Sequence, residues 1–141
     1  MEFVRGDHVE VCSREEGFLG SYFAATVVER LAGGKFYKVK YKNLVTEEDE
    51  FQPLMETISA AEIRPSPPRY IPVVFRRRDA VDAFDNDGWW VGEVTGRKDN
   101  LFSVYFRTTG DEIEYPFNRL RAHVDWVNGQ WVSPPSSSRG L

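Results

Sequence analysis

Hydrophobic and polar residues alternate with a period of two along most of the chain, in short runs that turns separate. These runs predict β-strands at 7–13, 22–29, 36–41, 49–54 and 63–64, and again at 80–84, 89–96, 101–106, 111–116 and 120–123. Turn-forming stretches such as LAGGK and GRKDN lie between strands. Only LMETISAAEI is suited to a helical turn. The pattern therefore predicts an all-β protein.

The two halves of the chain share one order of features, which indicates an internal repeat over 6–43 and 78–108. Each copy has an alternating strand, an acidic turn with a glycine, an aromatic pair, a β-branched strand and a strand that ends in an aromatic residue. The pairs are Tyr22-Phe23 and Trp89-Trp90. Five short strands per copy predict two small, strongly bent β-barrels. Because each has a marginal core alone, we expect them to pack as one unit.

The segment RPSPPRYIPV, at 64–73, contains four prolines and is typical of a stiff linker. It predicts a first domain at 1–66 and a second at 67–134. Residues 135–141 belong to a Ser/Pro-rich end that is typical of a disordered tail or linker. Before it, VDWVNGQWV predicts a hairpin around Asn-Gly.

In the second copy, aromatic residues lie at the ends of the predicted strands. Val81 and Ala83 share the phase that suits a core, and Phe84 lies in the other phase. We expect Phe84, one tryptophan of the pair Trp89-Trp90, and Phe106 to converge at one barrel end. Such rings form a cage whose π faces attract a methylated ammonium. The alternative is that these rings only fill the core of a small barrel.

Periodicity does not decide which tryptophan is buried, since neither phase of WWVGEVT is cleanly apolar. The first copy offers a second candidate cage. Its first strand ends in Cys12-Ser13, so a ring from the longer loop SREEGFLGS would have to replace Phe84. The candidate rings of this copy are Phe18, Tyr22, Phe23 and Tyr41.

Carboxylates surround both candidate cages and would attract a cationic peptide. The candidates are Glu15, Glu16, Asp49, Glu50, Asp85 and Asp87. The alternative is that they form solvated loops. The formal net charge is −4, and residues 1–68 carry all of it, with 8 basic and 12 acidic residues. This balance argues against a binder of phosphate backbones. The basic run Arg76–Arg78 keeps nucleic acid as an alternative partner.

Other chemistry finds little support in the sequence. The one cysteine, Cys12, allows neither an intrachain disulfide nor a zinc cluster, which suits a reducing compartment. The two histidines, His8 and His123, have no nucleophile at a recognisable spacing, and LAGGK is not a complete phosphate loop. No apolar run suggests a membrane span or a signal peptide. We expect no catalysis, no metal, no cofactor and a monomer.

The segments GDHVEV, EEGFLGSYFAATVVE and KFYKVKY, and their counterparts DAVDAFDNDGWWVGEV and LFSVYF, resemble the plant Agenet domain in its tandem form. Agenet domains belong to the Tudor-like superfamily of SH3-like bent barrels. The resemblance covers roughly residues 3–134 and implies two tandem Tudor-like barrels. Matched to the family pattern, the cage rings are Phe84, Trp90 and Phe106, with Trp89 adjacent.

The resemblance also implies a function. Similar tandem proteins are readers of heterochromatin in the nucleus, and they bind histone tails at methylated lysine. We therefore expect a non-catalytic reader of histone H3 methylated at its ninth residue. The alternatives are a Tudor-like adaptor that binds RNA and one that binds unmodified peptides.

Overall fold

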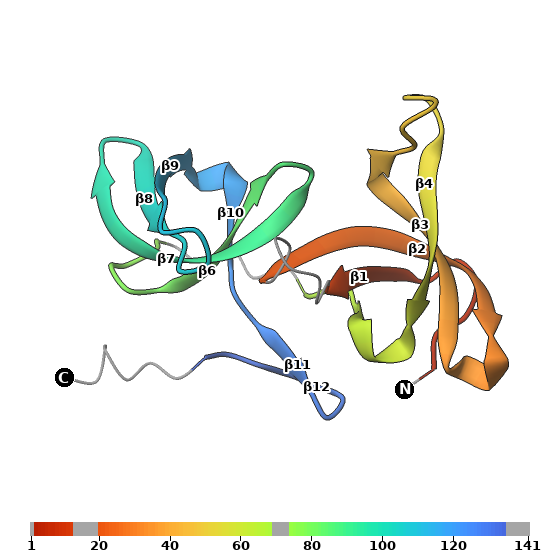
Figure 1. Ribbon diagram of the computed structural model, residues 1–141. Coiled ribbons are helices and arrows are strands. Elements are labelled where there is room, and N and C mark those ends of the chain that lie inside the picture. Colours follow the sequence, from red (N-terminus) through yellow and green to blue (C-terminus); the bar gives the residue numbers. More distant parts are fainter. Residues whose placement is uncertain (1, 13–19, 69–73, 135–141) are drawn as a thin grey trace. The chain divides into compact units, whose positions relative to one another are not determined.

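A computed structural model of the chain describes residues 2–12, 20–68 and 74–134. Across these ranges the chain forms twelve β-strands, three short 3-10 turns and no α-helix (Figure 1). None of the described segments is a helix long and apolar enough to cross a membrane. The chain divides into two compact units, Met1–Ser66 and Pro67–Leu141, and each is described by itself. The all-β prediction is confirmed.

Unit 1 is an antiparallel sheet of five strands. They are β1 (His8–Cys12), β2 (Ser21–Leu31), β3 (Phe36–Val45), β4 (Pro53–Ser59) and β5 (Ile63–Pro65). The 3-10 turn η1 (Ala32–Gly34) joins β2 to β3, and η2 (Ala60–Glu62) leads into β5. β1 pairs with β2 and β5, β2 also pairs with β3, and β3 pairs with β4. The register shifts between Val27 and Glu29, as at a β-bulge, which bends a strand and increases its twist.

Four of the five strands predicted for this unit are confirmed, but the strand predicted at 49–54 is wrong. The acidic stretch forms a turn instead, and β4 starts only at Pro53. The backbone N–H of Asp49 donates to Thr46 Oγ1 at 3.1 Å, and the N–H of Phe51 donates to Asp49 Oδ1 at 2.9 Å. Side-chain bonds of this kind compete with strand pairing. Most of the predicted helical turn is also strand, with only the 3-10 turn η2 at its end.

Unit 2 repeats this topology. Its strands are β6 (Ala80–Asp85), β7 (Gly88–Lys98), β8 (Leu101–Tyr105), β9 (Glu112–Pro116) and β10 (Leu120–Ala122), and the 3-10 turn η3 (Phe117–Arg119) precedes β10. β6 pairs with β7 and β10, β7 pairs with β8, and β8 pairs with β9. All five predicted strands are confirmed, with ends that differ by at most two residues.

After β10, the strands β11 (Asp125–Val127) and β12 (Gln130–Val132) form a separate two-stranded sheet. Asn128 and Gly129 between them both have positive φ, 50° and 77°. A type I′ turn requires positive φ at both central residues. Trp126 lies directly opposite Trp131, and the ring centroids are 4.9 Å apart. The predicted hairpin around Asn-Gly is confirmed.

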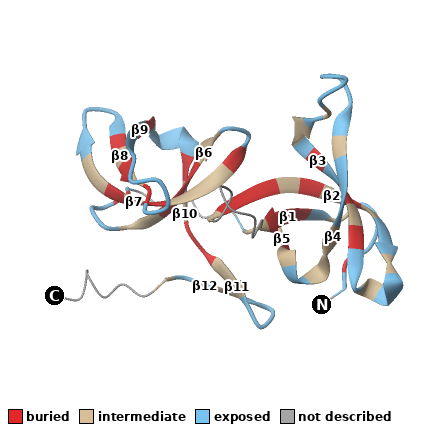
Figure 2. Ribbon diagram, in the orientation of Figure 1, coloured by how far each residue is buried: buried red, intermediate tan, exposed pale blue. Residues whose placement is uncertain are grey.

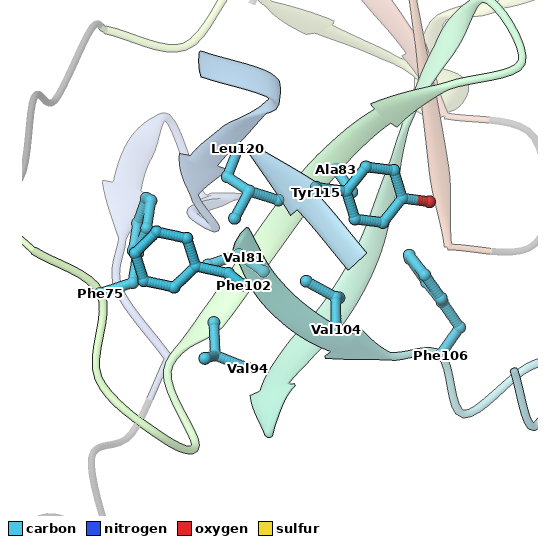
Figure 3. Packing of buried hydrophobic residues seen from close by; sticks show 9 residues of the cluster. All are labelled: Phe75, Val81, Ala83, Val94, Phe102, Val104, Phe106, Tyr115 and Leu120. Atoms are coloured by element: carbon cyan, nitrogen blue, oxygen red, sulfur yellow. The ribbon is translucent and has the colours of Figure 1, made fainter. Parts of the chain in front are cut away.

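Each unit has a core built from alternate residues of its paired strands, seen as the buried bands in Figure 2. In unit 1 the core includes Val9, Val11, Phe23, Ala25, Val27, Tyr37, Val39, Tyr41 and Ile63. The core of unit 2 is drawn in Figure 3 and consists of Phe75, Val81, Ala83, Val94, Phe102, Val104, Phe106, Tyr115 and Leu120. The predicted core phase of Val81 and Ala83 is confirmed, since neither is exposed.

Candidate functional site

The strand register separates the two adjacent tryptophans. Trp90 lies opposite Ala83, and Trp89 lies opposite Phe84. Because directly opposed residues share a face of the sheet, Trp90 lies on the core side with the fully buried Ala83. Trp89 and Phe84 lie on the other side, called here the outer face, with ring centroids 5.1 Å apart. The expected convergence of Phe84 with Trp90 and Phe106 is therefore wrong, because a strand alternates its faces.

A different set of side chains gathers around Trp90. Its indole Nε1–H donates to the backbone oxygen of Asp85 at 2.7 Å, and the Tyr115 hydroxyl donates to Asp85 Oδ2 at 2.7 Å. The ring of Phe106 meets that of Tyr115 edge-on, with centroids 6.1 Å apart and an interplanar angle of 81°. We call these four residues, Asp85, Trp90, Phe106 and Tyr115, the Asp85 cluster.

The sequence places Asp85 in this cluster through a tight turn. Asp85 ends β6 in the same phase as Ala83, and the chain then reverses through Asn86 and Asp87, whose φ values are 47° and 64°. Asn and Asp are the residues other than glycine that adopt this conformation most readily. Asp87 is exposed in the turn, so of the two predicted acids only Asp85 joins the rings.

The position of Phe106 depends on a missing side chain in β7. A Cβ on Gly92 would lie 2.4 Å from Val104 Cγ1 and 3.1 Å from Phe106 Cε1. Glycine therefore allows β8, and Phe106 directly after it, to pack closely against β7. Tyr115 comes from β9, opposite Phe102. The sequence prediction missed Tyr115 because it considered only the first three strands of the copy; the alternation of EIEYP was the available signal.

In the Asp85 cluster the Tyr115 hydroxyl keeps its proton and donates it in a hydrogen bond to the Asp85 carboxylate. Burial raises the pKa of the Tyr115 hydroxyl well above its usual range, and the hydrogen bond to Asp85 and its negative charge raise it further. Phe106 and Tyr115 are nearly buried, whereas Trp90 and Asp85 are half-buried. The accessible part of the cluster is thus an indole next to a carboxylate, which suits a cation with apolar substituents.

On the outer face of unit 2, an arginine of the same chain lies over the ring of Trp89. The guanidinium carbon of Arg121 lies 4.2 Å from the ring centroid. Arg121 Nε donates to Asp82 Oδ2 at 2.8 Å, and His123 Nδ1 lies 2.8 Å from Asp82 Oδ1. The side chain of Asp82 is 1% exposed, so this group is part of the packed structure. Trp89 therefore does not belong with the Asp85 cluster.

The predicted rings of unit 1 divide in the same way. Phe23 lies opposite Val11 and Tyr41 opposite Ala25, on the core side, and the Tyr41 hydroxyl donates to Glu56 Oε1 at 2.7 Å. Tyr22 lies on the outer face, where the guanidinium carbon of Arg64 is 3.5 Å from its ring centroid. Phe18, the fourth ring of this prediction, is outside the described residues.

The acidic candidates of unit 1 are not part of this core-side pair. Asp49 and Glu50 are exposed in the turn between β3 and β4, and Glu15 and Glu16 are outside the described residues. The sequence analysis did not predict Glu56 as a site residue. Its hydrogen bond with the Tyr41 hydroxyl identifies it. Unit 1 therefore offers a smaller core-side set, consisting of Phe23, Tyr41 and Glu56.

Two bent β-units with one strand order, each with an aromatic and carboxylate set on its core side, define a tandem Tudor-like binding module. The model of the Agenet domain family matches residues 6–68. The chain belongs to this Agenet domain family, as the sequence resemblance predicted. The match covers unit 1, and the topology shared by unit 2 extends the same fold to the second copy.

Relatives over almost the whole chain support this assignment. The crystal structure of Arabidopsis thaliana AGDP1 AGD34 has a TM-score of 0.88 and 42% identity, covering 94% of this chain and 90% of that one. The crystal structure of ADCP1 tandem Agenet domain 3-4 has a TM-score of 0.84 and 38% identity, covering 94% and 89%.

Among curated proteins, the Arabidopsis thaliana protein AGENET DOMAIN (AGD)-CONTAINING P1 is 44% identical over 133 residues. DUF724 domain-containing protein 6 from the same plant is 37% identical over 135 residues. The chain covers 25% of the length of the first and 19% of the second. The similarity therefore describes one tandem module of these longer proteins.

Proposed function

We propose that the chain is a non-catalytic chromatin reader that binds methylated lysine in a histone tail through the Asp85 cluster. The observation that carries this proposal is the carboxylate of Asp85, fixed by the Tyr115 hydroxyl next to the half-buried indole of Trp90. A methylated ammonium offers methyl groups to the ring face and, when it is not fully methylated, an N–H to the carboxylate.

The arrangement supports a preference among methylation states. A mono- or dimethylated lysine keeps an N–H that can donate to Asp85, whereas a trimethylated lysine has none. A trimethylated lysine would cover the Asp85 carboxylate but donate no hydrogen bond to it, which is unfavourable. We therefore expect mono- and dimethyllysine to bind more tightly than trimethyllysine.

The choice of peptide rests on the family. The resemblance to heterochromatin readers directs the proposal to histone H3 methylated at its ninth residue, and hence to the nucleus. The exposed acids Asp87, Asp49 and Glu50 support a basic tail as the partner through long-range attraction. An adaptor for unmodified peptides is the competing function, and it needs only this charge.

The test is a calorimetric titration with H3 tail peptides that are unmodified, mono-, di- and trimethylated at the ninth residue. We expect binding that depends on methylation, and Trp90→Ala should abolish that dependence. Trp89→Ala is the matched control, because it removes an equal ring from the outer face. Equal affinity for the unmodified and methylated peptides would instead support the adaptor and overturn the proposal.

The same titration decides between the units. Tyr41→Ala removes the core-side ring of unit 1 and its bond to Glu56. If the Asp85 cluster holds the methylated lysine, Tyr41→Ala keeps the methylation dependence that Trp90→Ala loses. The reverse result would assign the guest to unit 1.

A further inference from the structure

Unit 2 has a second candidate surface at the end of its core away from the Asp85 cluster. Figure 3 shows the core running from Phe75 at one end to Phe106 and Tyr115 at the other. Beside Phe75 lies an open groove of about 510 Å³, and no carboxylate lines it. Its lining includes Val74, Arg97, Asn100, Phe102, Phe117 and Asn118.

The groove presents an aromatic ring on a rigid support. Phe117, the first residue of η3, is 38% exposed. Its ring centroid lies 5.3 Å from that of Phe75 and 6.2 Å from that of Phe102, and both of these are core residues. A large ring that is fixed by the core and open to solvent can take a flat partner without losing further side-chain freedom.

Polar side chains also line the groove. Arg97 lies opposite Phe102, with its guanidinium carbon 5.4 Å from the centre of that ring, and its Nε donates to the backbone oxygen of Asp99 at 3.1 Å. The amides of Asn100 and Asn118 add both donors and acceptors. The groove thus combines a ring, a cation and two amides.

Basic residues gather at the same end of the unit. Arg76, Arg77 and Arg78 lie in a turn that is bonded to β7, since the N–H of Arg78 donates to the backbone oxygen of Val94 at 2.6 Å. β7 continues from Val94 to Arg97 and Lys98, which are exposed like the three arginines. The segments that contain these five cations, residues 76–79 and 97–99, include two carboxylates, Asp79 and Asp99.

The surroundings of the groove are locally basic. Arg97 lines it, and the exposed Lys98 and Arg76–Arg78 lie on the segments that contain its lining residues Arg97 and Val74. Residues 1–68 carry the whole net charge of −4, so it does not argue against an anionic partner at a groove of unit 2. Local fields steer a charged ligand more strongly than net charge does when opposite charges are segregated.

We propose that this groove binds single-stranded nucleic acid. In this proposal a base stacks on Phe117, the amides of Asn100 and Asn118 bond to the edge of the base, and Arg97 with its basic neighbours contacts phosphates. Single strands are bound by this combination of aromatic rings and basic side chains. An acidic peptide would use the cations but has no base for the ring and amides, so the observations favour nucleic acid.

The test measures the anisotropy of a short fluorescein-labelled oligouridylate, titrated with the chain at several salt concentrations. We expect binding that weakens as salt rises. Phe117→Ala should weaken it about tenfold, as for loss of one stacked base. Arg97→Gln should reduce the slope of log affinity against log salt by about one, as for loss of one phosphate contact.

Two controls keep the result specific. Arg107→Gln removes an exposed arginine next to Phe106, at the other end of the unit, and should leave the affinity unchanged. Asn118→Ala removes an exposed amide that is not in the core, so it tests the groove even if Phe117→Ala perturbs folding. Equal losses from Arg107→Gln and Arg97→Gln would show non-specific attraction and overturn the proposal.

A competitor separates the two classes of anionic partner. Unlabelled polyglutamate should displace the oligouridylate poorly, and displacement at equal charge would overturn the proposal in favour of an acidic peptide. Trp90→Ala should keep nucleic-acid binding, and Phe117→Ala should keep binding of the methylated peptide. The failure of one proposal is therefore distinguishable from the failure of the other.

Discussion

In both units a carboxylate on the first strand pairs with an arginine on the fifth, and the arginine lies over an aromatic ring. In unit 1 these are Glu10, Arg64 and Tyr22, with Arg64 Nη2 2.8 Å from Glu10 Oε1. In unit 2 they are Asp82, Arg121 and Trp89. The members occupy equivalent register positions, since Glu10 lies opposite Arg64 and Asp82 opposite Arg121. The repeat thus preserves an ion pair and a ring on its outer face.

The core sides of the two units differ. In unit 2, Tyr115 comes from the fourth strand of the unit and bonds to a carboxylate at the end of its first strand. Unit 1 has Ile58 at the corresponding register position, and its tyrosine bond runs from Tyr41 to Glu56 instead. The comparison teaches that the outer face is common scaffold, whereas the two copies differ in the side chains at their core-side ends.

The largest expected effects come from breaking the shared ion pairs. Glu10→Ala and Asp82→Ala should each destabilise their own unit by about 3–5 kcal/mol. Glu10→Ala leaves the buried Arg64 without its carboxylate, and Asp82→Ala removes a buried carboxylate that holds both the half-buried Arg121 and the buried His123. All four tryptophans lie in unit 2. Urea unfolding followed by tryptophan fluorescence should therefore shift with Asp82→Ala, while tyrosine fluorescence should report the shift with Glu10→Ala.

An exposed ion pair supplies the control for that prediction. Arg30 Nη2 lies 2.6 Å from Glu2 Oε1, but the two side chains are 41% and 69% exposed. Glu2→Ala should cost at most about 1 kcal/mol in spite of the short distance. A cost for Glu10→Ala as small as that for Glu2→Ala would show that the outer-face pair is not essential to the scaffold.

The next effect concerns the close packing beneath Phe106. Gly92→Ala should destabilise unit 2 by about 1–3 kcal/mol, because the new Cβ collides with Val104 and displaces Phe106. Unit 1 already has Ala25 at the corresponding position opposite Tyr41. The converse change, Ala25→Gly, should cost only about 0.5–1 kcal/mol. Thermal unfolding of the two variants compares these costs, and equal costs would contradict the packing difference.

A smaller effect should separate the methylation states. Asp85→Asn keeps the size and an acceptor oxygen but removes the charge. The preference for dimethyl- over trimethyllysine should fall by about tenfold, as for loss of about 1.4 kcal/mol of charge assistance. Calorimetry with the two peptides measures the ratio. Glu56→Gln, the equivalent change in unit 1, should leave the ratio unchanged, and the opposite outcome would assign the recognition of methylation to unit 1.

The smallest effect is the pH dependence of unit 2. Because the pKa of Tyr115 is raised in the folded state above its ordinary value of 10.0, the folded state keeps a proton that the unfolded state releases at high pH. The stabilisation is complete below pH 10 and declines as the pH rises above it. Tyr115→Phe should reduce the loss of melting temperature between pH 9 and pH 11, as measured by tryptophan fluorescence. An identical loss in both proteins would contradict the raised pKa.

Much of the fold followed from period-two alternation, since every strand of unit 2 was predicted, and the core phase of Val81 and Ala83 with it. The acidic stretch before Pro53 misled the prediction because its Asp49 and Thr46 side chains bond to the backbone and form a turn. Neither tryptophan of the pair could be assigned, since Gly92 and Glu93 interrupt both phases. The register decided it, through pairing with Ala83 and Phe84.

The binding chemistry was less accessible from the sequence than the fold. Asp85, Trp90 and Phe106 could be named in advance, but Tyr115 is 30 residues from Asp85 and its contact depends on the path of β9. The groove beside Phe75 was also hidden, because its parts come from residues 74, 97–102 and 116–118. Local patterns predict which face a side chain takes, whereas sites built from distant segments depend on the whole barrel.

The arginine over Trp89 has a consequence for selectivity. A guanidinium attached to the same barrel competes for that ring at a high effective concentration, which short connections typically raise to about the millimolar range. Arginine also keeps its charge at all physiological pH values, so Arg121 remains a cation over the Trp89 ring throughout this range. A methylated lysine that arrives from solution would have to displace it. The outer aromatic face is in this sense inhibited by its own chain, so Trp89 is a poor receptor for a foreign cation.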